Sequence, residues 1–226
     1  MTYAIGLLLL LLLFNLPSWW VRYVMRKHSA DIESMPGTGA ELAQHLIDRF
    51  ALAGVTVKQG GAHDNYYDPE NNSICLSPLV FNGKSLTAVA IAAHEVGHAI
   101  QFTNNEPISK LRTQYLSKAF SIKRIGIALT SVLSLAAIVI KAPQFLLLTA
   151  AIAILTMLAS VAMYLAILPE EWDASFNKAL PLLKSGYLDD KHLPAVTEIL
   201  KAAAYTYVAG ALAEVLNLWR WLRIMR

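Results

Sequence analysis

The residues of this chain whose types and spacing could do chemistry are two histidines and a glutamate. His94, Glu95 and His98 form an H-E-x-x-H pattern. On a helix, residues four positions apart lie one above the other, so both imidazoles can bind one metal ion. Glu95 then points beside the metal and can act as a base toward a water molecule there. The pattern therefore predicts a metal-dependent hydrolytic site.

The sequence around this pattern favours a helix from Ser85 to Phe102, because it contains no helix breaker except the small residue Gly97. We expect Gly97 to permit the close approach of a neighbouring backbone. The apolar run from Leu86 to Ala93 is too short for a membrane span. The metal-binding helix therefore belongs to a soluble portion of the chain.

The composition nevertheless indicates a membrane protein. Of the 226 residues, 56% are hydrophobic and 15% are charged, and the apolar residues are clustered. The net charge is +3 and no basic stripe is interleaved with aromatic residues, so no nucleic-acid partner is expected. The single cysteine, Cys75, excludes an intrachain disulfide and a cysteine-rich zinc site, and it fits a reducing compartment.

The first three quarters of the chain contain three apolar stretches that are long enough, or nearly so, to cross the bilayer. Residues 2–21 precede Arg22, Arg26 and Lys27, which predicts an uncleaved anchor whose C-terminal end is cytoplasmic. Ile125–Ile140 and Phe145–Leu168 are separated by a short polar turn, which predicts a transmembrane hairpin over residues 125–168. The lipid bilayer is therefore an expected partner.

A hairpin crosses the membrane twice, so residue 169 must emerge on the same side as His94 and His98. Lys118, Lys123 and Arg124 precede the hairpin and predict that this side is cytoplasmic. We expect a helix that begins at Pro169 within a soluble segment, 169–200. The final apolar run, 202–219, either spans the membrane or lies in its interface.

The soluble portion, residues 29–118, has mixed secondary structure. Thr38 and Glu41 can form a capping box for a helix that Gly54 ends. Residues 55–57 and Ser73–Leu76 are typical of short strands, and an edge of their sheet could bind a substrate backbone. The predicted fold class is a mainly α membrane protein with a small α+β zincin-like soluble portion, an N-terminal anchor, a central transmembrane helical hairpin and a C-terminal apolar helix.

A catalytic zinc ion usually has three protein ligands and one open position. The metzincin pattern would place a third histidine six residues after His98, but that residue is Asn104. Acidic residues cluster just after the hairpin instead, on the same side of the membrane as the two histidines. The spacing alone leaves three candidates open: Glu170, Glu171 and Asp173.

Several segments together resemble the bacterial YugP-like membrane zinc metallopeptidases, which are similar to the larger HtpX and CAAX-protease group. They are Ala92–Gln101, Leu76–Pro78 with Val80-Phe81, Leu168–Ser175, and the segment from residue 202 onward. In that family the third, gluzincin-type ligand is a glutamate followed three residues later by Ala-Asp. The resemblance selects Glu171, which is followed at that distance by Ala174 and by Ser175 in place of the usual aspartate. The family's Asp-His-Tyr-Asp-Pro signature corresponds here to Asn65–Pro69.

The resemblance implies one Zn²⁺ per chain, held by His94, His98 and Glu171, with Glu95 as general base and later proton donor. The expected activity is that of a zinc-dependent endopeptidase at the membrane surface, acting on a peptide or a membrane protein. It implies a multi-pass protein of the bacterial cell membrane with a cytoplasmic active site; the sequence indicates no oligomeric state. Candidates for stabilising the transition state, or for orienting the ligands, are His63, Tyr66, Tyr67, Arg112 and Ser175.

Two other interpretations remain open at this stage. An intramembrane site-2-type protease would take its third ligand from a Leu-Asp-Gly motif, and Leu188-Asp189 is the nearest match. The polar run that follows Asp189 disfavours a position inside the membrane. A non-hydrolytic zinc-containing membrane interaction protein is the second alternative, but a structural zinc site needs no base such as Glu95.

Overall fold

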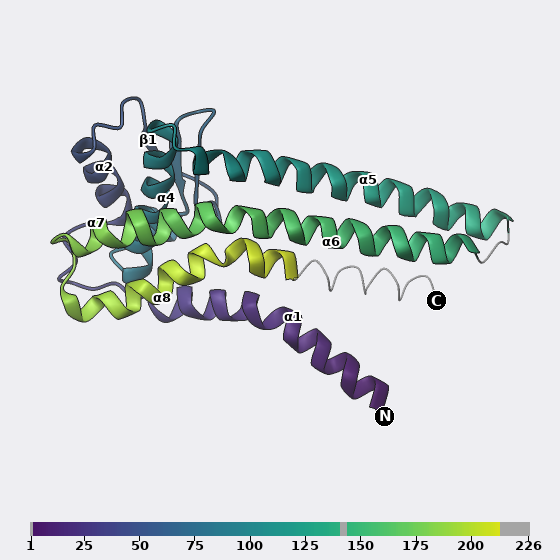
Figure 1. Ribbon diagram of the computed structural model, residues 1–226. Coiled ribbons are helices and arrows are strands. Elements are labelled where there is room, and N and C mark those ends of the chain that lie inside the picture. Colours follow the sequence, from purple (N-terminus) through teal and green to yellow (C-terminus); the bar gives the residue numbers. More distant parts are fainter. Residues whose placement is uncertain (1, 141–143, 213–226) are drawn as a thin grey trace. The chain divides into compact units, whose positions relative to one another are not determined.

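The computed structural model describes residues 2–140 and 144–212 of the chain, and it divides into two compact units (Figure 1). Of the described residues, the first unit comprises 2–18, 111–140, 144–168 and 207–212, and the second comprises 19–110 and 169–206. Helix α1 (Thr2–Lys27) begins in the first unit and ends in the second. The H-E-x-x-H residues and the acidic cluster both belong to the second unit.

The second unit contains a three-stranded sheet in the order β1-β3-β2. Strand β1 (Thr56–Gln59) pairs parallel to β3 (Ser73–Leu76), whereas β2 (Tyr66–Asp68) pairs antiparallel to it. Ile74 and Leu76 of the central strand are fully buried, and Tyr67 opposite Ile74 is buried as well. The two strands expected from the sequence are confirmed, and β2 lies where only a polar turn was expected.

Helix α2 (Gly39–Arg49) begins with the predicted capping box, because Thr38 accepts from the Glu41 N–H and the Glu41 side chain accepts from the Thr38 N–H. The prediction that this helix ends at Gly54 is wrong. It ends at Arg49, and Ala51 then adopts a left-handed backbone with φ of 48°. Gly54, with φ of 79°, serves the turn that leads into β1 instead.

Helix α4 (Leu86–Thr103) is the centre of the second unit and contains the H-E-x-x-H residues. Ser85 caps it by accepting from the Ala88 N–H. Its residues Leu86–Gln101 are all buried, because α2, α3 (Pro78–Asn82), the sheet and the C-terminal helices pack around it. The predicted helix is confirmed, and its position in the core makes it the fixed element of the site.

The C-terminal part of the second unit follows directly from a long helix. Helix α6 (Gln144–Trp172) continues through Pro169, so the prediction of a new helix beginning there is wrong. Trp172 leads into η2, a π-helix (Asp173–Ala179), in which the Leu180 N–H bonds to Ser175 O, five residues back. A proline inside a helix costs about 3 kcal/mol, whereas the burial of the apolar residues Ala174, Ala179 and Leu183 that follow it is favourable.

Three short helices complete the second unit: α7 (Leu180–Lys184), η3 (Asp190–His192) and α8 (Leu193–Ala204). Val196, Ile199 and Leu200 of α8 are fully buried in the same core as α4. Glu198 of α8 pairs with Lys27 and His28 at the end of α1, at 2.8 and 2.9 Å. These contacts tie the chain segments before and after the hairpin into one core.

The first unit is built on α5 (Lys110–Ile140) and α6, which lie side by side where Gly126 packs against Thr156 (Figure 1). Two of the described helical stretches, Pro107–Ile140 and Gln144–Lys184, are long and apolar enough to cross a membrane. The first begins with the short 3-10 helix η1 (Pro107–Ser109). Residues 141–143 of the predicted polar turn and residues 213–219 of the predicted last apolar helix lie outside the described residues; residues 206–212 are helical.

Gly97 lies where α4 approaches η2 most closely. A β-carbon built on Gly97 would lie 2.7 Å from the backbone oxygen of Ala174, a distance that real side chains do not tolerate. The expectation that this glycine permits close approach is confirmed. Helix α4, which bears His94 and His98, is therefore at backbone contact with η2, which begins two residues after Glu171.

We expect Gly97→Ala to lower the free energy of unfolding by about 1–3 kcal/mol, because the added methyl group must push η2 away. Gly210→Ala is the matched control, since it also lies in a helical stretch and its β-carbon would meet nothing within 4 Å. Thermal unfolding of the full chain in detergent compares the variants. A Gly97→Ala protein as stable as the Gly210→Ala protein would contradict the close-packing argument.

Candidate metal centre

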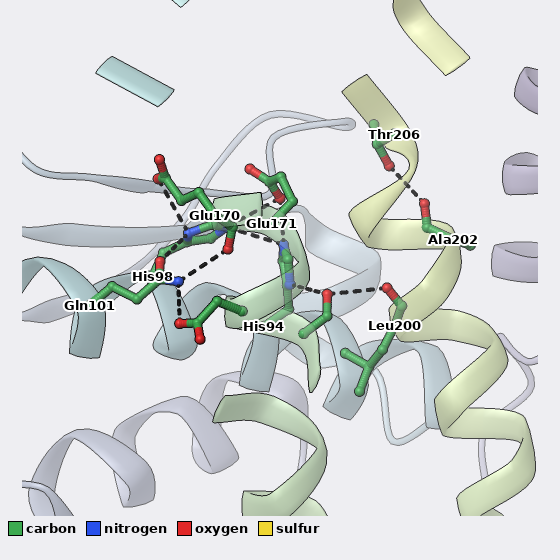
Figure 2. A network of polar contacts seen from close by, with 10 residues as sticks. His94, His98, Gln101, Glu170, Glu171, Leu200, Ala202 and Thr206 are labelled. Carbon is green, nitrogen blue, oxygen red and sulfur yellow. Dashed lines mark hydrogen bonds and ion pairs between the residues drawn. The ribbon is translucent and has the colours of Figure 1, made fainter. Parts of the chain in front are cut away.

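Three potential ligand atoms converge in the core of the second unit (Figure 2). His94 and His98 come from consecutive turns of α4, and Glu171 comes from the last turn of α6. The Nε2 atoms of the two histidines are 3.3 Å apart, and Glu171 Oε2 lies 3.2 Å from His94 Nε2 and 3.3 Å from His98 Nε2. The three atoms form a nearly equilateral triangle.

The size of this triangle matches a tetrahedral zinc site. Zinc binds imidazole nitrogen and carboxylate oxygen at ~2.0–2.1 Å, which separates neighbouring ligand atoms by about 3.3 Å at tetrahedral angles. The separations of 3.2 and 3.3 Å agree with this edge length. Three ligands of this kind leave a fourth position for water or substrate, as catalytic zinc sites do.

The opposite nitrogen of His94 is held by a short hydrogen-bond chain. Ser175 Oγ lies 3.0 Å from His94 Nδ1 and donates to the backbone oxygen of Leu200 at 3.2 Å. Because the serine has a single hydroxyl hydrogen and gives it to Leu200, it accepts the hydrogen of His94 Nδ1. This tautomer leaves an electron pair on His94 Nε2, which faces the other two ligand atoms.

His98 is held in the same way by a residue that the sequence analysis missed. Its Nδ1 lies 3.1 Å from Gln101 Oε1, one helical turn further along α4. The signal was present in the sequence, since a glutamine three positions after a histidine shares its helix face. Both imidazoles therefore present an unprotonated Nε2 to one point, which is the arrangement a metal ion requires.

The carboxylates at the site are deeply buried. Glu95 and Glu171 are 5% and 2% exposed. Burial raises the pKa of the Glu171 carboxyl, but the adjacent imidazoles of His98 and His94, when protonated, outweigh burial through their charge and hydrogen bonds and hold that pKa below its ordinary value. Among the described residues, Glu95 Oε2 and Glu171 Oε1 are buried oxygens without a hydrogen-bond partner. An unpartnered oxygen on Glu171, which supplies one of the three converging ligand atoms, fits a bound cation.

The other candidates from the sequence have varied surroundings. Asp173 and Glu170, the alternatives to Glu171, bind Gln101 through a side chain and a backbone oxygen. Tyr67 is buried and its hydroxyl donates to Asn72 at 2.7 Å. The remaining residues are placed as follows: Tyr66 and His63 are exposed, Arg112 belongs to α5 in the first unit, and Asp189 is exposed and pairs with Lys191. The roles predicted for Tyr66, Tyr67, His63 and Arg112 stay predictions.

Comparison with known proteins places the chain in a family. A family described as "putative neutral zinc metallopeptidase" matches residues 3–226, nearly the whole chain. The chain belongs to this family. The metal that the family name specifies is the one whose ligand spacing the triangle of His94, His98 and Glu171 matches.

Among curated proteins, the chain is similar to a Bacillus subtilis protein described as "putative membrane protease YugP". The two are 29% identical over 212 residues, which cover 92% of this chain and 91% of the relative. The resemblance to the YugP-like family is thereby confirmed. No solved structure matches the chain.

We expect Ser175→Ala to weaken zinc binding by about 10- to 100-fold, because His94 loses the acceptor that fixes its tautomer and ring orientation. Ser185→Ala is the control, since the exposed Ser185 hydroxyl also donates to a backbone oxygen. Competition with a chelating indicator measures both affinities. Equal affinities in the two variants would show that Ser175 does not orient the ligand.

Proposed function

We propose that this protein is a zinc-dependent endopeptidase that cuts peptide bonds at the membrane surface. The observation that carries the proposal is the buried triangle of His94 Nε2, His98 Nε2 and Glu171 Oε2, with Glu95 next to the first of these residues. Membership in the zinc metallopeptidase family supports it. One zinc ion per chain follows from one such cluster among the described residues.

The proposed roles of the residues follow from their chemistry. When bound, zinc lowers the pKa of the water it holds and polarises the scissile carbonyl. Glu95 takes a proton from the attacking water as the new carbon–oxygen bond forms. The same carboxyl then gives that proton to the amine nitrogen as the carbon–nitrogen bond breaks. His94, His98 and Glu171 keep their electron pairs on the metal throughout.

The proposed position near the bilayer surface rests on the continuity of α6. The predicted span ends at Leu168, and Glu171 follows three residues later in the same helix. At 1.5 Å per residue, the ligand is about 4.5 Å further along the helix axis than the end of the span. Membrane proteins and membrane-proximal peptides are therefore the proposed substrates. The basic residues before the hairpin, Lys118, Lys123 and Arg124, support a cytoplasmic active site.

The site-2-type alternative has less support from the structure. Asp189, its proposed third ligand, has a side chain that is 70% exposed and pairs with Lys191 at 2.9 Å. The non-hydrolytic alternative leaves Glu95 without a role. Its carboxylate is buried with one oxygen unpartnered, which is unfavourable for folding, and this alternative offers no reason for keeping it there.

We expect Glu95→Gln to keep about one zinc per chain and to lower kcat by at least ~10²-fold, because the amide cannot accept the proton from water. Exposed Glu33 provides the control variant Glu33→Gln. Zinc content is measured by metal analysis, and cleavage is measured on a broad panel of quenched fluorescent peptides. If Glu95→Gln cleaves as fast as the parent, the mechanism is wrong; a zinc-loaded parent that cuts nothing in the panel favours the non-hydrolytic alternative.

We expect Glu171→Ala to lose zinc, because two imidazoles alone do not complete the three-ligand set. Asp189→Ala is the matched control and should retain zinc, since this carboxylate binds Lys191 at the surface. Metal analysis of the two purified proteins separates the gluzincin-type site from the site-2-type site. The opposite result, with zinc lost in Asp189→Ala alone, would overturn the proposed ligand set.

A further inference from the structure

We propose that Gln101 is a positioning residue that joins the negative charge of Asp173 to the metal ligand His98. The inference rests on the proposed zinc site and concerns how this chain prepares one of its ligands. Gln101 is fully buried although its side chain is polar. All of the residues involved lie in the second unit, and Figure 2 shows Gln101 between His98 and Glu170.

The Gln101 amide makes hydrogen bonds on both of its sides. Its Nε2 donates to Asp173 Oδ2 at 2.8 Å and to the backbone oxygen of Glu170 at 3.1 Å. Its Oε1 lies 3.1 Å from His98 Nδ1. A buried amide with three partners at these distances is constrained in both position and rotation.

These partners also fix which end of the amide faces the histidine. The carboxylate of Asp173 and the carbonyl of Glu170 are acceptors only, so the NH₂ group must face them. The amide oxygen then faces His98, and His98 Nδ1 must carry the hydrogen. Rotating the amide by half a turn would set its oxygen against two acceptors. The chain of bonds therefore fixes the His98 tautomer that leaves Nε2 free for a metal.

The negative charge of Asp173 acts on His98 through the Gln101 amide, a chain of hydrogen bonds that we call the Gln101 relay. Asp173 is itself held by Asn177, which donates to Oδ1 at 2.7 Å, and by Lys178 at 3.8 Å. Its carboxylate polarises the amide, and the amide oxygen in turn makes His98 a better electron-pair donor. The carboxylate of Glu170 lies 3.8 Å from His98 Nδ1, which is too long for a hydrogen bond.

The two histidines are thus supported differently. Ser175 and a backbone carbonyl hold His94, so no carboxylate takes part in that chain. His98 is the imidazole that is linked to a carboxylate. The link runs from α4 to the segment that also contains Glu171, so docking of residues 170–175 brings in the third ligand and orients His98 in one step.

The first test uses Gln101→Leu in the full chain, which keeps a similar volume and removes both polar ends. We expect zinc affinity to fall by about 10- to 100-fold, measured by competition with a chelating indicator. The visible spectrum of the cobalt-substituted protein should change as well, because His98 is no longer oriented. The control is Gln44→Leu, since exposed Gln44 also donates its amide to an aspartate, Asp48, at 2.9 Å.

The second test separates positioning from packing by exchanging the amide and the carboxylate. Gln101→Glu alone sets two carboxylates against each other and should bind zinc as weakly as Gln101→Leu. Adding Asp173→Asn restores a donor, because the new amide at position 173 can donate to the new carboxylate at position 101, which accepts from His98. We expect the double variant to recover zinc affinity and the parent's cobalt spectrum.

Two results would overturn the inference: parent-like affinity and spectrum in Gln101→Leu, or a double variant that binds no better than Gln101→Glu. If Gln101→Leu fails to fold, the comparison of Gln101→Glu with the double variant tests the inference. A double variant that also fails to fold counts as no recovery. A parent protein that binds no zinc would refute the proposed function instead. The parent's zinc stoichiometry therefore distinguishes failure of the relay from failure of the zinc site.

Discussion

The structure depends on the convergence of three electron pairs in a buried place. Two imidazole Nε2 atoms and one carboxylate oxygen lie within 3.3 Å of one another, and hydrogen bonds on the far side of each ring keep these electron pairs pointing inward. Such an arrangement repels itself unless a cation lies between the atoms. The metal that the family name specifies would supply the counter-charge that this arrangement requires.

The residues of α4 that pack near this centre are small, which permits the close approach of the neighbouring segment. Ala92, Ala93 and Ala99 of α4 are fully buried, and Gly97 lies at contact distance from the backbone of Ala174. Small residues let the C-terminal segment approach α4 closely enough for Glu171 to reach both histidines. The π-helix η2 and the proline within α6 both lie in the segment that makes these close contacts.

The sequence predicted the parts of the fold that depend on local chemistry. The capping box of Thr38 and Glu41, the helix that bears His94 and His98, and the two longer strands follow from neighbouring residues alone. The sequence-based predictions were wrong where contacts between distant residues determine the structure. A three-residue strand such as β2 has no recognisable period of its own, and the helix through Pro169 persists only because its far end is buried.

For the candidate site as well, the sequence predicted only what local geometry determines. The sequence by itself determined that His94 and His98 share a helix face, because helical geometry fixes residues four positions apart. It left Glu170, Glu171 and Asp173 equivalent, and the resemblance to a family was needed to choose among them. Only the tertiary structure shows that Glu171 Oε2 lies against both Nε2 atoms and that Gln101 and Ser175 contact the opposite ring nitrogens. Contacts between residues more than 70 positions apart depend on how the two segments dock, and no local pattern encodes that.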